Sequence, residues 1–128
     1  MNLNQVTLPT DDVLASVQFY ERMGFALIVS SPHYARFECP EGDATFSVHL
    51  ADRPLQESGV IVYFECANVD RTVESLEALG LSFSQRATDQ PWLWREARLR
   101  DPAGNVICLF SAGENRKNPP WRVPGAAV

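Results

Sequence analysis

Aromatic and charged side chains alternate with apolar ones in several short segments of this sequence. In the segment 93–100, Trp94, Glu96 and Arg98 occupy every second position. Because successive side chains of a strand point to opposite faces, these three are expected to share one face. Aromatic rings mixed with Arg and Glu are typical of a cleft that binds small organic molecules. The alternatives are that this face packs against another subunit, or that its rings only cover exposed sheet.

The same alternation adds candidates from three other segments. In these segments, the residues expected to face away from the helices are Gln5, Thr7, Tyr34, Arg36, Glu38, Ile61, Tyr63 and Glu65. Apolar residues fill most of the opposite face, as a one-sided core requires. Arg95 is the poorest fit there, and we expect it at the end of its strand.

Composition and charge narrow the class of protein. The 128 residues include 11 Lys plus Arg and 16 Asp plus Glu, which gives a net charge of −5. This balance argues against a nucleic-acid or anionic membrane partner. No apolar run approaches the roughly 20 residues that span a bilayer, and the first residues do not resemble a signal peptide. Three widely spaced cysteines (Cys39, Cys66 and Cys108) fit reduced thiols and a cytoplasmic location.

Two segments that lie 56 residues apart, Asp12–Phe25 and Asn68–Leu81, share one pattern. Each begins with an Asx residue that can cap a helix. Each ends near a glycine, Gly24 or Gly80, the residue best suited to the left-handed position after a helix. The apolar positions of each predicted helix fall on one face. These positions are Val13, Val17, Tyr20 and Met23 in the first helix, and Val69, Val73, Leu76 and Leu79 in the second.

Strand-like segments follow both predicted helices. They are Phe25–Val29, Tyr34–Cys39 and Thr45–Leu50 after the first, and Leu81–Gln85, Leu93–Arg100 and Asn105–Phe110 after the second. The arrangement predicts an α+β fold of two tandem βαβββ modules, residues 1–56 and 57–112. The second module is expected to carry a longer loop near Arg86–Pro91. Residues 113–128 form a C-terminal tail without periodicity.

The register of the segment Thr45–Leu50 has two solutions. Burying Phe46, Val48 and Leu50 points Ser47 and His49 away from the helix. Matching the turns of the two modules instead aligns Phe46 with Cys108, which reverses every side chain. We favour the first register, because it buries three large apolar groups.

Two motifs carry a resemblance to a known family. One is Asp-x-x-x-Ser-x-x-Phe-Tyr-x-x-x-Gly-Phe, formed by Asp12, Ser16, Phe19, Tyr20, Gly24 and Phe25. The other is the turn Asp101-Pro102-Ala103-Gly104-Asn105. Together they resemble the vicinal oxygen chelate superfamily over about residues 3–112. This superfamily includes lactoylglutathione lyase, bleomycin resistance proteins and extradiol dioxygenases. The resemblance implies an open, cup-shaped mixed sheet with the helices outside.

The metal-dependent members of that superfamily hold a divalent ion with four His, Glu or Gln ligands, two from each module. The resemblance places Gln5, Ile61 and Cys108 at three of these positions and leaves His49 as a candidate for the fourth. Isoleucine has no donor atom, so the set is broken. We therefore expect no cofactor. A divalent metal held by Gln5, His49 and Cys108 is the disfavoured alternative.

The first functional hypothesis is a metal-free binder of small molecules in the manner of bleomycin resistance proteins. Its ligand pocket would comprise Gln5, Thr7, Tyr34, Arg36, His49, Tyr63, Glu65, Trp92, Trp94, Glu96, Arg98 and Cys108. The alternative is a superfamily enzyme of lyase, isomerase or dioxygenase type with an atypical metal site or with metal-free acid–base chemistry. Glu65 or Glu96 would then be the general base if nearby rings raise its pKa.

The expected partners are a small-molecule ligand and a second copy of the chain, with no nucleic acid and no membrane. In the tail, the sequence Pro119-Pro120-Trp121-Arg122 carries residue types that are common at interfaces. This tail is expected either to seal a homodimer or to lie on its own domain. A third hypothesis is that the whole fold serves as an interaction module.

Overall fold

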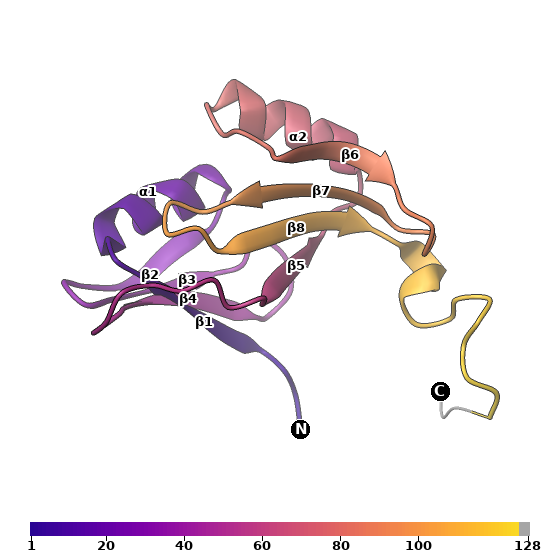
Figure 1. The fold of residues 1–128 in the computed structure, drawn as a ribbon, viewed down its shortest axis with the longest axis horizontal. Helices are drawn as coiled ribbons and strands as arrows, with labels where there is room; N and C mark the ends of the chain where they lie inside the picture. The colour runs from indigo at the N-terminus through magenta and orange to yellow at the C-terminus, as the bar shows by residue number, and fades with distance from the viewer. Residues whose placement is uncertain (126–128) are drawn as a thin grey trace. The chain divides into compact units, whose positions relative to one another are not determined.

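The computed structural model describes residues 1–125 and divides into two units. One unit comprises Met1–Val60 with Arg100–Val106, and the other comprises Ile61–Leu99 with the chain from Ile107 onward. The first contains β1 (Gln5–Thr10), α1 (Val13–Arg22), β2 (Ala26–Ser31), β3 (Tyr34–Glu38) and β4 (Thr45–Leu50). The remaining elements are β5 (Ile61–Glu65), α2 (Val69–Ala78), β6 (Gln85–Asp89), β7 (Arg95–Arg100), β8 (Val106–Ser111) and the 3-10 turn η1 (Gly113–Arg116). Figure 1 shows these elements in chain order.

The two sheets have the same topology. One has the strand order β1-β4-β3-β2, and the other has the order β5-β8-β7-β6. In the first sheet β1 runs parallel to β4, whereas β3 is antiparallel to both β4 and β2. Each sheet thus contains the four strands of one βαβββ module, which confirms the predicted α+β fold.

The helix ends confirm the predicted signals. The side chain of Asp12 accepts a hydrogen bond from the backbone N–H of Ala15 at 3.0 Å, and that of Asn68 accepts one from Arg71 at 3.0 Å. The glycines that follow the two helices both adopt a positive φ, which is 97° at Gly24 after α1 and 90° at Gly80 after α2. A side chain at either position would be strained, because a β-carbon disfavours this region.

The core of the first unit is aromatic. The buried ring of Tyr20 on α1 lies 4.7 Å from that of Phe46 on β4 and 5.7 Å from Phe25 and Phe37. Phe46 and Val48 therefore point to the helix side. This supports the favoured register of β4.

The second unit buries Val69 and Val73 of α2 against Ala97 of β7. Arg95 lies on this same helix side at the first residue of β7. Its guanidinium binds both carboxylate oxygens of Asp70 at 2.8 Å, which explains how a charged residue fits there. Leu79 departs from the predicted apolar face, since 56% of its surface is exposed.

The prediction around β6 is wrong in position. The strand forms at Gln85–Asp89 instead of Leu81–Gln85, so most of the expected loop Arg86–Pro91 is sheet. The reason is an irregularity in its pairing with β7. Gln85 pairs with Arg98 and Thr88 with Glu96, and the register shifts between them. A bulge of this kind absorbs the extra residues without ending the strand.

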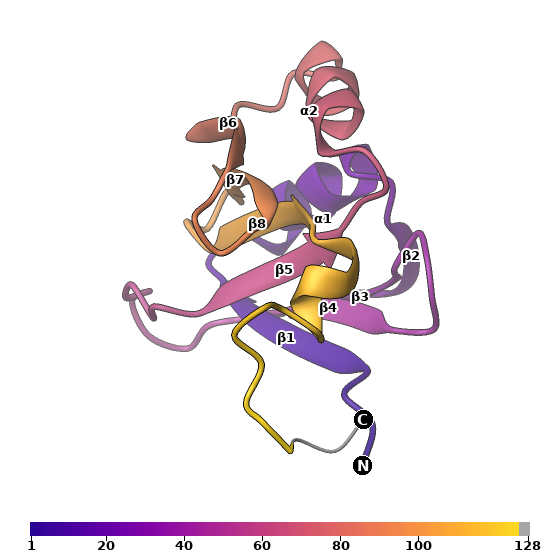
Figure 2. The same cartoon turned by 90° about the vertical axis from the view of Figure 1, so that its right-hand side faces the viewer.

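The tail begins as an ordered turn. Figure 2 shows η1 directly after β8, followed by a loop drawn in yellow. The indole N–H of Trp94 reaches the carbonyl oxygen of Asn115 at 3.4 Å, and Arg116 lies 3.9 Å from Glu65. The first residues of the predicted tail thus lie on their own unit, whereas positions 126–128 fall outside the described residues. Within residues 1–125, no helix is both long and apolar enough to cross a membrane.

Candidate functional site

In the first unit, polar side chains gather on the sheet face opposite α1. Ser47 of β4 is fully buried at the centre of this group. Its hydroxyl accepts a hydrogen bond from Nε2 of Gln5 at 2.7 Å and shares another with the hydroxyl of Thr7 at 2.6 Å. The hydroxyl of Thr45 donates to Oε1 of Gln5. Hydrogen bonds therefore fix both the nitrogen and the oxygen of the Gln5 amide.

Tyr34 and Arg36 of β3 extend this polar face. Nε of Arg36 donates to the phenolic oxygen of Tyr34 at 2.9 Å. In the sheet register, Tyr34 pairs with His49 and Arg36 with Ser47. The rings of Tyr34 and His49 meet edge to face at 6.2 Å. All five candidates predicted from this module thus share one face.

Ser47 is the central residue of this group, and the predicted pocket did not include it. The alternation already pointed its side chain away from the helix, but a serine between Phe46 and Val48 gives no signal of its own. Ser47 joins the polar group because β4 pairs with β1 and places Ser47 beside Thr7. This pairing between distant strands is visible in the structure but not in the local sequence pattern.

In the second unit, the aromatic candidates pack on one another. Trp94 stacks on Phe110 with centroids 4.5 Å apart and planes at 18°. Tyr63 meets both rings edge-on at 5.8 Å. The partly buried side chains of Trp94 and Ile61 also cover Cys108, Phe110 and Ala112. Much of this aromatic surface therefore covers the sheet, as one of the sequence alternatives expected.

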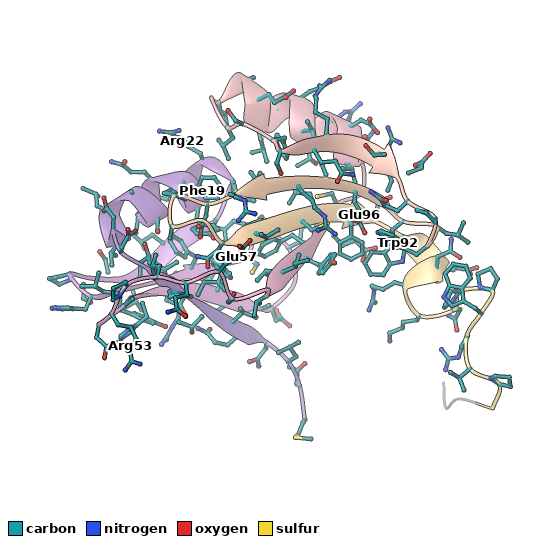
Figure 3. All side chains as sticks on the ribbon, viewed as in Figure 1. Phe19, Arg22, Arg53, Glu57, Trp92 and Glu96 are labelled. Carbon is teal, nitrogen blue, oxygen red and sulfur yellow. The ribbon has the colours of Figure 1, made fainter. Side chains whose placement is uncertain are left out.

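Glu96 is the buried carboxylate of the second unit, with only 1% of its surface exposed. One oxygen accepts the indole N–H of Trp92 at 2.7 Å, and the other lies 3.3 Å from the guanidinium of Arg98. Figure 3 shows Trp92 and Glu96 together. Burial raises the pKa of the Cys108 thiol to about 12, and the charge of Glu96 adds to this effect, so the thiol is protonated at neutral pH.

The two predicted candidates for a general base differ in environment. The Glu96 carboxylate is buried and contacts both Trp92 and Arg98. The Glu65 side chain is 46% exposed, and its carboxylate lies 3.9 Å from the guanidinium of Arg116. A buried carboxylate with fixed donors is the arrangement that active sites use to position charge. Of the two, Glu96 is therefore the stronger functional candidate.

Comparison with known proteins gives the family. The profile of the Glyoxalase/Bleomycin resistance protein/Dioxygenase superfamily matches residues 2–109. The chain belongs to this superfamily. A search of curated sequences finds no match.

Solved structures agree with the glyoxalase-type fold. A glyoxalase/bleomycin resistance protein/dioxygenase from Nocardioides has a TM-score of 0.75 at 23% identity, over 100% of this chain and 90% of that one. A lactoylglutathione lyase from Agrobacterium tumefaciens has a TM-score of 0.70 at 21% identity, over 86% and 92%. TioX from Micromonospora sp. ML1 has a TM-score of 0.69 at 21% identity, over 88% and 99%. At these identities the likeness shows the fold alone.

The metal-ligand positions of the superfamily can now be traced through this glyoxalase-type fold. Gln5 and Ile61 are the first residues of β1 and β5, and Ser47 and Cys108 are the third residues of β4 and β8. Gln5 contacts Ser47 in one sheet, and Ile61 packs near Cys108 in the other. Ser47 therefore occupies in β4 the place that Cys108 occupies in β8. His49 pairs with Pro9 in the sheet. Because Pro9 is four residues after Gln5 on β1, His49 lies about 13 Å along the strand from Gln5.

These four residues do not fit a divalent ion of the usual kind. The amide oxygen of Gln5 already accepts a bond from Thr45, and Ile61 offers no donor. The Ser47 hydroxyl is engaged by Gln5 and Thr7, and the Cys108 thiol is protonated at neutral pH. Across residues 1–125, no group of three or more His, Cys, Asp or Glu side chains is placed to hold a metal ion.

Proposed function

We propose that this member of the superfamily binds a small organic ligand without the four-ligand metal site. The observation that carries the proposal is the donor chemistry of Gln5, Ser47, Ile61 and Cys108. Metal sites of this superfamily use His and Glu ligands, and these residues are poor substitutes for them. The amide and the hydroxyl are already hydrogen-bonded, the isoleucine is a hydrocarbon, and the thiol is protonated. The residues suited to recognition are aromatic and charged instead.

Partly exposed rings support this function. Tyr63 is 41% exposed and Trp92 is 42% exposed, although each also contacts its own unit. Flat rings of this kind can stack on a planar ligand. In the predicted pattern, Glu65 of β5 and Arg98 of β7 lie on the sheet face that points away from the helix, and they supply charges of both signs. A planar ligand with a charged substituent fits these groups.

Equilibrium dialysis against a panel of planar and cationic compounds tests the proposal. The protein is first treated with EDTA, and each measurement is repeated with added Zn²⁺ or Ni²⁺. We expect binding that the metals do not change and that Trp92→Ala weakens about tenfold, the loss of one stacking contact. Leu79→Ala is the matched control, because Leu79 is also exposed but lies at the end of α2. Absence of binding across the panel, or binding that requires the metal, would contradict the proposal.

The second candidate function is metal-free acid–base catalysis by a superfamily enzyme. The burial of Glu96 between Trp92 and Arg98 favours it. The test is isomerisation of a hemithioacetal by EDTA-treated protein, since this reaction needs only proton transfer. We expect Glu96→Gln to abolish any activity found, and Glu65→Gln to retain it.

A homodimer and a cytoplasmic location are further parts of the proposal. All three cysteines remain thiols, which suits a reducing compartment. Exposed Trp121 and Val123 make the tail a candidate for the dimer contact. Truncation after Ser111 followed by sizing would show whether the tail holds two copies together.

A further inference from the structure

The Glu96 carboxylate links two other side chains of the second unit. Its Oε2 accepts the indole N–H of Trp92 at 2.7 Å, and its Oε1 lies 3.3 Å from Nη2 of Arg98. Glu96 and Arg98 are two residues apart on β7, so their side chains leave the same face of the strand. One buried carboxylate therefore holds a flat ring and a guanidinium group close to each other.

The tip of the β6–β7 hairpin also fixes Trp92. The backbone N–H of Gln90 donates to the carbonyl oxygen of Trp94 at 2.8 Å, and that of Leu93 donates to the carbonyl oxygen of Gln90 at 3.0 Å. These bonds close the three-residue loop Pro91–Leu93, whose last residue has a φ of 67°. Loops of this type place their last residue in the left-handed region, which the β-carbon of Leu93 disfavours. The loop thus sets the backbone at Trp92 before any ligand arrives.

The exposed fractions decide which charge a ligand can reach. The Glu96 side chain is 1% exposed, whereas the Arg98 side chain is 29% exposed. A guanidinium group carries five N–H donors, and Arg98 directs one of its nitrogens, Nη2, at Glu96. Further donors of Arg98 can therefore bind a ligand. The accessible charge beside Trp92 is positive.

Glu65, the other acidic residue predicted for this face, stands apart from Arg98. It lies on β5, and β8 separates β5 from β7 in the sheet. Two strand spacings, about 10 Å, therefore separate the strands that carry Glu65 and Arg98. The Glu65 carboxylate also faces the guanidinium of Arg116 at 3.9 Å. Its negative charge is thus offset locally and does not cancel that of Arg98.

We propose that Trp92 and Arg98 together form a receptor for planar aromatic carboxylates. The ring of the ligand stacks on the exposed part of the Trp92 indole. Its carboxylate accepts hydrogen bonds from the Arg98 guanidinium, whose planar fork matches carboxylate geometry. This inference rests on the proposed function and adds to it the sign of the ligand's charge and the residue that selects that charge.

Three naphthalene probes of similar size test the sign of the charge. They are 2-naphthoate, the neutral 2-naphthamide and the cationic 2-naphthylmethylamine. Equilibrium dialysis with the EDTA-treated, full-length protein measures each Kd at about 0.15 M salt, where the net charge of the chain is largely screened. We expect 2-naphthoate to bind about tenfold more tightly than the other two probes, because hydrogen bonds to charged groups exceed neutral ones by this factor.

Variants separate recognition of the charge from stacking on the ring. Arg98→Met should lower the affinity for 2-naphthoate to that for 2-naphthamide and leave the amide unaffected. Arg98→Lys should retain part of the preference, because the charge returns without the planar fork. Trp92→Ala should weaken all three probes about tenfold and leave their ratios unchanged.

Arg86→Met is the matched control for Arg98→Met. Arg86 is also an arginine of this unit paired with a glutamate, but its partner Glu77 lies on α2. We expect this variant to bind all three probes as the wild type does. Circular dichroism verifies that each variant is folded.

The ratio of the affinities for 2-naphthoate and 2-naphthamide separates this inference from the proposed function. If planar compounds bind but 2-naphthoate has no advantage over the amide, the assignment to aromatic carboxylates is wrong and the proposed function stands. The same holds if Arg98→Met keeps the advantage in a folded protein. If no planar compound binds, the proposed function fails and this assignment fails with it.

Discussion

The hydroxyl of Tyr20 donates a hydrogen bond of 2.6 Å to Oδ2 of Asp101, although 81 residues separate them in the sequence. The buried Asp101 also accepts bonds from the backbone N–H groups of Ala103 and Asn105 and from the Asn105 amide. That amide continues to the carbonyl oxygen of Pro9 on β1 at 2.9 Å. The two motifs that carry the family resemblance are thus joined in one hydrogen-bond network of the first unit.

Tyr20→Phe removes one bond of this network and should destabilise the fold. Asp101 retains its bonds to Ala103 and Asn105, so we expect a loss of about 1–3 kcal/mol. Urea unfolding followed by circular dichroism measures the change. Tyr63→Phe is the matched control and should lie within about 0.5 kcal/mol of the wild type. An unchanged midpoint for Tyr20→Phe would show that the bond contributes nothing.

Alkaline pH should weaken the same contact. Burial raises the pKa of Tyr20, and the neighbouring Asp101 charge adds to the shift. The folded state therefore favours the neutral phenol. Its contribution is complete below about pH 10, the usual tyrosine pKa, and is lost as the pH rises above that value. The stability difference between wild type and Tyr20→Phe should shrink in urea titrations above pH 10. A difference that stays constant would contradict this assignment.

Glu96→Ala should destabilise the protein and free the Trp92 indole N–H to bind water. The substitution leaves the Trp92 indole and the Arg98 guanidinium without their carboxylate. Both side chains can reach water in part, so we expect a loss of about 1–3 kcal/mol. Trp92 fluorescence should shift to longer wavelength, because the indole N–H becomes hydrated. Trp94 and Trp121 complicate the spectrum, so the measurement compares Glu96→Ala in the wild type and in a Trp92→Phe background. An identical shift in both backgrounds would rule out Trp92 as its source.

The sequence was most informative where local signals act over a few residues. The caps at Asp12 and Asn68, the glycines after both helices and the alternation in 93–100 follow from short-range rules, and the structure agrees with them. The position of β6 was missed because a bulge, not the apolar pattern, sets its pairing with β7. Ser47 was missed for a similar reason. Its role comes from Gln5 and Thr7 on another strand, about 40 residues away.

The reactivity of Cys108 tests whether this residue is a metal ligand. Its side chain is fully buried, and burial together with the Glu96 charge raises its pKa to about 12. A protonated, enclosed thiol reacts slowly, since the thiolate is both the nucleophile and the metal ligand. At pH 8, iodoacetamide should therefore alkylate the half-buried Cys39 and Cys66 before Cys108, and urea should expose Cys108 to rapid alkylation.

Added Zn²⁺ extends this measurement. A thiolate that binds zinc is protected from alkylation, and the protection disappears when EDTA removes the ion. We expect Zn²⁺ to leave the slow alkylation of Cys108 unchanged, because the thiol is protonated and its neighbour Ile61 supplies no donor for the ion. Glu96→Gln sharpens the comparison, since loss of the carboxylate charge lowers the pKa of Cys108 and should accelerate its alkylation. Alkylation of Cys108 as fast as that of Cys39, or protection that depends on Zn²⁺, would favour a metal-binding thiolate over a buried, protonated thiol.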